Sequence, residues 1–356
     1  MNLELDEDLR MLADSVSGWL KQYLPFDRRR EMRGGAAMRA FWDEMQGALG
    51  VAGAGLPEAW GGFGHGPEAH MVVAEALGSA LAPTPYIESP VVVGTLLARL
   101  GGQDELGAAL AAGKLVVLGW EEEQSRGDAL SVRTEAVEAN GAWTLTGVKR
   151  AVRWAAQADT VLVTARTGEG LGVFRIDGPA PTRDYRLIDD HPAADLLLEN
   201  TPATLIAAGD AAAAAITAAV DAGTAAVCAE GVGLMRTLLD DTVDYTKQRK
   251  QFGQALASFQ VLQHRMVDMR IQLEQSAAAA ILAALRGNDP AAVSAAKAQV
   301  GEAARYVGQQ AVQLHGGMGL TEELRVGHYF RRTTAIENQF GDADAHTRRY
   351  RKLKVA

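Results

Sequence analysis

The sequence is poor in cysteine, in positive charge and in long apolar runs. Cys228 is the only cysteine among 356 residues, so an intrachain disulfide is excluded and we expect a reducing, cytoplasmic location. The formal net charge of −9 argues against nucleic-acid partners and anionic membrane surfaces. The acidic N-terminal residues 1–8 lack the pattern of a signal peptide, which agrees with that location.

No apolar run reaches the roughly eighteen residues that a membrane-spanning helix needs. The alanine-rich stretch 211–227 comes closest, but Asp210 and Asp221 argue against its insertion. We therefore expect no membrane segment. The length is sufficient for two or three domains and a large hydrophobic core.

Three regions of different pattern follow one another along the chain. Residues 1–113 alternate helical patterns with Gly/Pro breaks, residues 114–208 have the pattern of short strands, and residues 209–356 that of long helices. In the middle region, Asn140-Gly141 is the strongest hairpin signal. The expected strands there are 116–120, 132–138, 143–149, 160–164 and 171–176.

Apolar side chains recur at helical spacing along successive stretches of the C-terminal region, which predicts an antiparallel four-helix bundle. The predicted fold class is therefore α+β: an N-terminal helical domain, a mostly antiparallel β domain and a C-terminal helical bundle. One of these stripes comprises Val293, Ala296, Val300, Ala304, Val307, Ala311 and Leu314.

Two blocks in the C-terminal region carry the chemical signal. Residues 249–260 read RKQFGQALASFQ, and residues 313–320 read QLHGGMGL. Together with the loop 49–62 and the stretch 75–83, and in this order, they resemble the acyl-CoA dehydrogenase family over nearly the whole chain. The resemblance implies FAD as cofactor, an oligomer, α,β-desaturation of an acyl-CoA, and electron transfer to an electron-transfer flavoprotein.

The same resemblance implies roles for individual residues. Arg249 matches the arginine that holds the diphosphate of a neighbouring subunit's FAD, a task that suits a planar guanidinium. The other matching cofactor positions, two of them glycines in a loop that approaches the cofactor closely, are Gln251, Phe252, Gln260, Gln313, Gly316 and Gly317.

Simpler interpretations of these positions stay open when each is taken singly. Arg249 could be a surface ion-pair residue after a helix, and Phe252 could be a core residue. Gly316 and Gly317 could form only a helix C-cap and turn. The ordered set favours the cofactor interpretation over these.

The catalytic base of the family has no counterpart here. Phe340 occupies the usual position of the glutamate, and Gly223 the alternative position on the first long helix. Flavin-side positions differ as well. The family's Thr-Glu-Pro region corresponds to residues 119–128, which contain three adjacent glutamates, and the flavin-contacting aromatic and threonine fall on Ala151 and Arg153.

We therefore hypothesise a non-catalytic subunit that completes the FAD site of a homologous catalytic subunit in a heterotetramer. One alternative is a self-sufficient homo-oligomeric dehydrogenase with a relocated base. Another is a flavin-free, acyl-CoA-binding pseudoenzyme. The carboxylates considered for a relocated base are Asp342, Asp344, Glu337 and Glu230.

Overall fold

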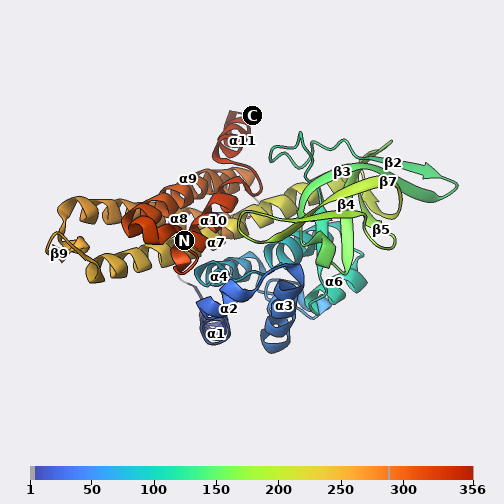
Figure 1. Ribbon diagram of the computed structural model, residues 1–356. Helices are drawn as coiled ribbons and strands as arrows, with labels where there is room; N and C mark the ends of the chain where they lie inside the picture. Colours follow the sequence, from blue (N-terminus) through green and yellow to red (C-terminus); the bar gives the residue numbers. More distant parts are fainter. Residues whose placement is uncertain (1–4, 288, 356) are drawn as a thin grey trace. The chain divides into compact units, whose positions relative to one another are not determined.

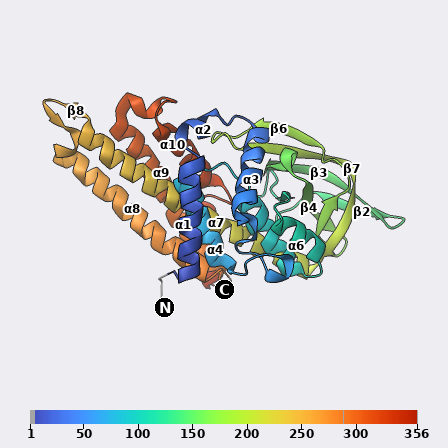
Figure 2. The ribbon, with the colours of Figure 1, turned by 90° about the horizontal axis from the view of Figure 1, so that it is seen from below.

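A computed structural model describes residues 5–287 and 289–355 (Figures 1 and 2). Residues 1–4, part of the acidic N-terminal stretch considered above, lie outside the described residues. The chain divides into two compact units. Unit 1 comprises Met1–Glu31, Met71–Ala82 and Thr224–Ala356, and unit 2 comprises Met32–His70 and Pro83–Gly223. The domain boundaries at 113 and 208 stay predictions.

The N-terminal region is helical, as expected. Its breaks fall at glycines and prolines, and Asp6 caps the first helix by accepting a hydrogen bond from the Leu9 amide at 2.8 Å. One segment, Ile87–Val93, forms a π-helix that contains Pro90. The α-helices are α1 (Glu7–Tyr23), α2 (Phe26–Glu31), α3 (Gly35–Leu49), α4 (Gly66–Ser79), α5 (Gly94–Leu100) and α6 (Asp104–Ala111).

The middle region forms a sheet that is mostly antiparallel, as predicted. Asn140 and Gly141 both have positive φ, 54° and 79°, as a type I′ turn requires, and they join two paired strands. Two strands were not predicted, the short β6 and the long β7. The strands are β1 (Val116–Gly119), β2 (Glu135–Ala139), β3 (Ala142–Arg153), β4 (Thr160–Thr167), β5 (Gly170–Ile176), β6 (Thr182–Arg186) and β7 (Pro192–Ala208).

The strand pairings of this sheet form a closed circuit. The order is β1-β4-β2-β3-β7-β5, and β4 also pairs with β5. Closure removes edges that would otherwise need partners. Leu145, Val163 and Phe174 are fully buried in its core.

A buried ion pair crosses the inside of this sheet. Lys149 Nζ donates to Glu122 Oε1 at 2.6 Å and to Thr164 Oγ1 at 3.0 Å. Glu122 also accepts hydrogen bonds from the amide and hydroxyl of Thr134. Burial would raise the pKa of Glu122, but Lys149 and these hydrogen bonds together lower it to about 2. Every member of this network therefore has a partner.

The C-terminal region is a helical bundle in which α9 packs against α8, α10 and α11. The stripe predicted on α9 is buried from Val293 to Leu314, which confirms the helical periodicity there. The elements are α7 (Asp210–Gln248), β8 (Lys250–Gln251), β9 (Gln254–Ala255), α8 (Gln260–Leu285), α9 (Pro290–His315), α10 (Arg325–Asn338) and α11 (Ala343–Val355).

Two glycines allow α4 and α7 to cross closely within unit 1. A Cβ atom on Gly78 would lie 2.1 Å from the Glu230 carbonyl oxygen, and one on Gly233 would lie 2.1 Å from the Glu75 carbonyl oxygen. Both carbonyl oxygens belong to the backbone and cannot move aside as a side chain could, so any residue larger than glycine would force the two helices apart.

By length and composition, α7 could also cross a membrane. However, 61% of its most apolar window is buried inside the protein. This degree of burial is typical of the core helix of a soluble protein.

We expect Lys149→Met to lower the free energy of unfolding by roughly 3–5 kcal/mol, because it leaves the Glu122 carboxylate buried without its cation. Lys114→Met, at an exposed lysine of the same unit, should change it by less than about 0.5 kcal/mol. Chemical denaturation measures both.

The pH dependence of the wild-type chain gives a second test. Since the folded pKa of Glu122 lies below its ordinary 4.5, the contribution of the ion pair is present above 4.5 and is lost as pH falls toward 2. Equal stabilities of wild type and Lys149→Met at pH 7 would contradict this account.

Candidate functional site

A hollow of about 620 Å³ lies in unit 1 where α7, the β8–β9 hairpin and α8 meet the end of α9. The hairpin joins α7 to α8 and lies at the tip of both helices (Figures 1 and 2). We call this site the Arg249 hollow. It is lined by Tyr245, Arg249, Gln251, Leu256, Leu262, Arg265, Gln313, Leu314, His315, Gly316, Gly317 and Met318.

The hollow brings together five of the seven residues that the sequence assigned to cofactor binding. They come from two blocks about fifty residues apart, one at the end of α7 and one at the end of α9. The exceptions are Phe252, at the tip of the hairpin, and Gln260, which is exposed at the start of α8. Neither lines the hollow. The roles of all seven in binding stay predictions.

The lining of the Arg249 hollow contains two arginines and no carboxylate. Within the part of the chain that the structure describes, the exposed Arg249 side chain makes no ion pair. Arg265 donates to the neutral Gln310 Oε1 at 3.3 Å. Both positive charges are therefore available to an anion, and guanidinium groups suit a diphosphate because they donate paired hydrogen bonds.

One wall of the hollow is fixed by an aromatic pair that the sequence analysis missed. The rings of Tyr245 and His315 stack with centroids 4.3 Å apart, and the Tyr245 hydroxyl donates to the His315 carbonyl at 3.3 Å. His315 Nδ1 donates to the Ala311 carbonyl at 2.8 Å. Burial lowers the pKa of His315, despite this hydrogen bond. The pair holds the end of α9 next to Gly316, whose φ of 62° turns the chain.

The hairpin tip carries an unusual residue. Phe252 has a φ of 55°, a region that bulky side chains rarely adopt. Its side chain is 91% exposed. With Gly253, also at positive φ, it forms the two-residue turn between β8 and β9. Its ring meets the ring of Phe259 edge-on, with centroids 6.2 Å apart.

Phe340, which the sequence analysis placed at the family's base position, lies in a tight turn after α10 and is buried. Its φ is 62°. His346 Nε2 donates to the Phe340 carbonyl at 3.0 Å, and Lys297 Nζ donates to the Gly341 carbonyl at 2.7 Å. These bonds fix the turn from two sides. The second base position, Gly223, lies within α7; neither residue has a group that could accept a proton from a substrate.

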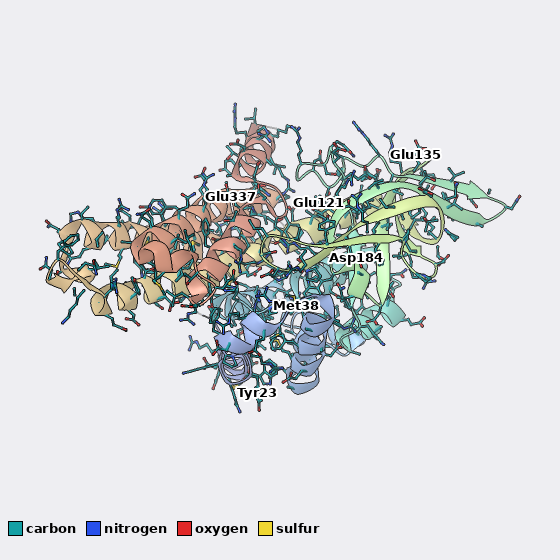
Figure 3. All side chains as sticks on the ribbon, in the orientation of Figure 1. Tyr23, Met38, Glu121, Glu135, Asp184 and Glu337 are labelled. Atoms are coloured by element: carbon teal, nitrogen blue, oxygen red, sulfur yellow. The ribbon has the colours of Figure 1, made fainter. Side chains whose placement is uncertain are left out.

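Three of the four carboxylates considered as a relocated base are engaged in hydrogen bonds or ion pairs. Glu230 is buried in a bidentate ion pair with Arg332, with contacts of 2.7 and 2.5 Å. Glu337, labelled in Figure 3, accepts from Arg305 Nη1 at 2.8 Å. Asp342 Oδ1 accepts from the Ala345 amide at 2.7 Å. Asp344 is exposed in the first turn of α11, where its negative charge interacts favourably with the helix dipole.

In unit 2, Arg153, which the sequence analysis placed at a predicted flavin contact, is paired with two carboxylates. Arg153 Nη1 lies 3.3 Å from Asp189 Oδ2, and its Nε lies 3.8 Å from Glu88 Oε1. Burial raises the pKa of Glu121, which is labelled in Figure 3, to about 7, with Arg153 opposing the rise. Glu122 belongs to the Lys149 network, so only Glu123 of the three glutamates is exposed.

These observations define a mixed helical and β protein with a preformed cationic site on its helical bundle. The sequence matches the family models "Acyl-CoA dehydrogenase, N-terminal domain" over residues 6–110 and "Acyl-CoA dehydrogenase, C-terminal domain" over residues 213–351. It is 31% identical to the acyl-CoA dehydrogenase IpdE2 of Mycolicibacterium smegmatis, over 97% of this chain and 98% of that one. The chain therefore belongs to the acyl-CoA dehydrogenase family, which confirms the resemblance.

Solved structures share the fold over almost the entire chain. The Tcur3481-Tcur3483 steroid ACAD superposes with a TM-score of 0.89 at 27% identity, covering 98% of both chains. The ChsE4-ChsE5 complex from Mycobacterium tuberculosis gives 0.88 at 24% identity, covering 100% of this chain and 99% of that one. The predicted order of helical, β and helical regions is thereby confirmed.

If Glu230 serves packing and not proton transfer, Glu230→Gln should lower the free energy of unfolding by roughly 3 kcal/mol, because it removes the charge that neutralises buried Arg332. Glu75→Gln, which breaks the more exposed pair with Arg236, should cost less than about 1 kcal/mol. Denaturation curves measure both. A loss of turnover in the range of about 10²–10⁴-fold without any loss of stability would instead identify Glu230 as the base.

Proposed function

We propose that this chain is the non-catalytic subunit of a heteromeric, FAD-dependent acyl-CoA dehydrogenase. The observation that carries the proposal is a contrast within one chain. The acid-free Arg249 hollow is intact, whereas both base positions hold residues, Phe340 and Gly223, that accept no proton. The chain would complete a cofactor site whose base and flavin-ring contacts come from a homologous subunit.

The chemistry of the donor set fits the diphosphate end of FAD. Arg249 and Arg265 would neutralise the phosphates, since the lining supplies no carboxylate to compete for them. Gly316 and Gly317 have no side chain, so the cofactor could approach their backbone closely. Gln251 and Gln313 offer amide donors. FAD, when bound, would accept the hydride from the β-carbon of the acyl-CoA. The partner's carboxylate would remove the α-proton.

The flavin ring has less to bind to on this chain. Where the family places its ring contacts, this chain has Ala151 and the charged Arg153, which is already neutralised by Glu88 and Asp189. The two carboxylates neutralise the charge of this arginine, so it attracts a second anion less strongly than an unpaired arginine would. This supports a division of labour in which the chain holds the diphosphate end of the partner's FAD.

The surface of the bundle supports a partner of similar fold. Besides Phe252, three aliphatic residues of α8 are strongly exposed: Val261 at 63%, Val267 at 56% and Ile271 at 47%. Exposed apolar side chains gathered on one helix are typical of protein interfaces. A homologous catalytic subunit in a heterotetramer is the occupant that we propose, with an electron-transfer flavoprotein as electron acceptor.

The substrate class and location belong to the same proposal. The Tcur3481-Tcur3483 structure, to which this chain is similar, is named a steroid ACAD, and its name joins two chains. We infer a bulky, steroid-like acyl-CoA and a heteromeric assembly by that similarity. The single buried thiol of Cys228 is consistent with the cytoplasm as location.

Neither alternative has comparable support. The self-sufficient dehydrogenase requires a free carboxylate, but Glu230, Glu337 and Asp342 are each engaged in a cap or an ion pair, which leaves it only Asp344 among the four carboxylates considered. A flavin-free pseudoenzyme could use the cationic hollow for the diphosphate of coenzyme A, but five residues of its lining are ones that the resemblance assigns to FAD, which favours the cofactor.

Arg249→Lys should weaken FAD binding by the assembled complex. Loss of a bidentate, charge-assisted contact removes roughly 1.5–3 kcal/mol, which corresponds to a roughly ten- to hundredfold higher Kd. Arg270→Lys, at an exposed arginine of α8 paired with Glu274, serves as the control and should leave the Kd unchanged. Fluorescence titration with FAD measures both, and equal Kd values for the two variants would contradict the assignment.

Phe340→Glu should not give the lone chain dehydrogenase activity. A carboxylate at this position would restore the base but not the missing flavin-ring contacts, so both parts of the site would still be needed. Turnover is measured with acyl-CoA and an artificial electron acceptor. Any acyl-CoA-dependent reduction by the lone Phe340→Glu variant would show that the chain holds a complete flavin site.

A further inference from the structure

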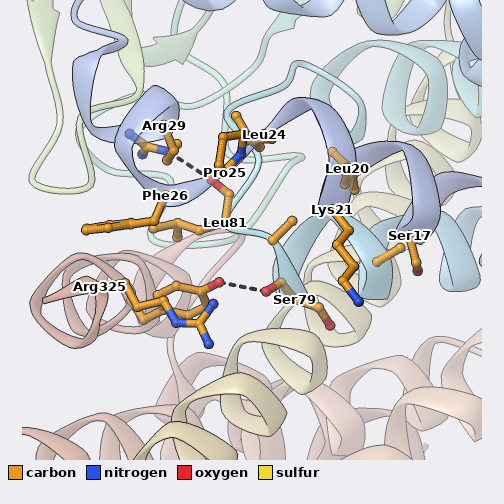
Figure 4. Close-up of a pocket in the computed structure, with 13 residues that line it drawn as sticks. Ser17, Leu20, Lys21, Leu24, Pro25, Phe26, Arg29, Ser79, Leu81 and Arg325 are labelled. Atoms are coloured by element: carbon orange, nitrogen blue, oxygen red, sulfur yellow. Dashed lines mark hydrogen bonds between the residues drawn. The ribbon is translucent and has the colours of Figure 1, made fainter.

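A second hollow lies within unit 1, among the helices α1, α2, α4 and α10 (Figure 4). Its volume is about 370 Å³, within the range of roughly 300–1,000 Å³ that small-molecule sites occupy. It shares no lining residue with the Arg249 hollow. We call it the Lys21 hollow.

The walls of the Lys21 hollow are largely apolar. Leu20, Leu24 and Leu81 are buried side chains that line it, and the ring of Phe26 adds an aromatic surface. Figure 4 shows these groups on the α1, α2 and α4 sides of the hollow. An apolar segment that enters the hollow would leave water for hydrocarbon, which favours binding in proportion to the buried area.

The lining is also positively charged: it includes three cations and no carboxylate. Arg325 already forms a bidentate ion pair with Asp241, and Arg29 Nε donates to the Leu81 carbonyl at 2.9 Å. Lys21 differs from both. Among the described residues it makes no hydrogen bond or ion pair, so its ammonium group is available to a ligand.

The hollow is held open by hydrogen bonds in its walls. The Ser79 carbonyl accepts from the Tyr329 hydroxyl at 2.6 Å and from Thr237 Oγ1 at 2.9 Å. The Tyr329 bond, drawn in Figure 4, ties α10 to the end of α4. Leu81, with a φ of 50°, is fixed by Arg29. Because these side chains are ordered before a ligand binds, binding does not have to offset the free-energy cost of ordering them.

We propose that the Lys21 hollow binds a small amphipathic carboxylate, with an alkyl or aryl chain against Leu20, Phe26 and Leu81 and its carboxylate at Lys21 Nζ. One available cation matches a single negative charge. A neutral ligand would leave that cation unused, and the exposed Ser17 hydroxyl in the lining can donate a further hydrogen bond to the carboxylate. The proposal depends on unit 1 alone and is independent of the FAD site.

Isothermal titration calorimetry of the full-length chain tests the proposal with three probes that share one alkyl chain: octanoate, octanol and octylammonium. We expect saturable binding of octanoate, weaker binding of octanol and none of octylammonium. Because the head-group contact is electrostatic, added salt should weaken octanoate binding more than octanol binding. Equal affinity for octanoate and octanol would overturn the proposal.

Two variants assign the site. Lys21→Met keeps the apolar stem but removes the charge, and it should raise the octanoate Kd about tenfold, as expected for a charge-assisted hydrogen bond. Ala80→Phe, in the wall of the hollow, should abolish octanoate binding by filling the space. Lys352→Met, at an exposed lysine of α11, is the matched control and should bind like wild type.

Lys21 is exposed, so Lys21→Met is expected to fold, and far-ultraviolet circular dichroism checks both variants. If Ala80→Phe does not fold, the comparison of Lys21→Met with Lys352→Met decides alone. An unchanged octanoate Kd in Lys21→Met would overturn the proposal, because binding would then occur elsewhere.

Discussion

The central constraint on this molecule is electrostatic: the Arg249 hollow contains guanidinium groups and no carboxylate. In a chain with a net charge of −9, acidic residues are abundant, and two neighbouring arginines would ordinarily form ion pairs with some of them. Here the nearest acceptor of Arg265 is a neutral amide. A surface of this kind suits an anion from outside the chain, as proposed for the diphosphate of FAD. The stacked Tyr245–His315 pair and the turn at Gly316 hold it in shape.

In the β region of unit 2, by contrast, two cationic side chains are paired with carboxylates. Lys149 is paired with Glu122, and Arg153 lies between Glu88 and Asp189. These cations are neutralised within unit 2, on the side that the sequence analysis assigned to the flavin ring. Phe340 is fixed in its turn by hydrogen bonds from His346 and Lys297. The predicted base position is thus part of a well-packed turn, and the paired Lys149 and Arg153 contrast with the exposed Arg249, which makes no ion pair among the described residues.

Much of this architecture follows from local sequence rules. The Asn140-Gly141 hairpin and the buried stripe on α9 were predictable, because turn chemistry and helical periodicity are local. β7 was not, since prolines at 192 and 202 and acidic residues interrupt its pattern. Its pairing with β3, β5 and β6 overrides that weak propensity.

The candidate site was predictable only in part. Arg249 and Gln313 were recognisable from their motifs, whereas Tyr245 and His315 contact each other only once α7 and α9 are packed together. Lys297 was not recognisable either, because a lysine on a helix gives no sign that it will be buried beneath a turn. Hints existed: Tyr245 lies one helical turn before Arg249, and His315 lies within the glycine block.

The most direct test of a shared FAD site is the visible absorption spectrum of the chain. It should be recorded for the chain purified alone and again after co-purification with a homologous subunit. That subunit should carry the family's Glu-Gly-Thr and Thr-Glu-Pro sequences. The account predicts no flavin band from the lone chain and a stoichiometric band from the complex. A full flavin band from the lone chain would contradict it, because the chain would then hold the entire cofactor by itself.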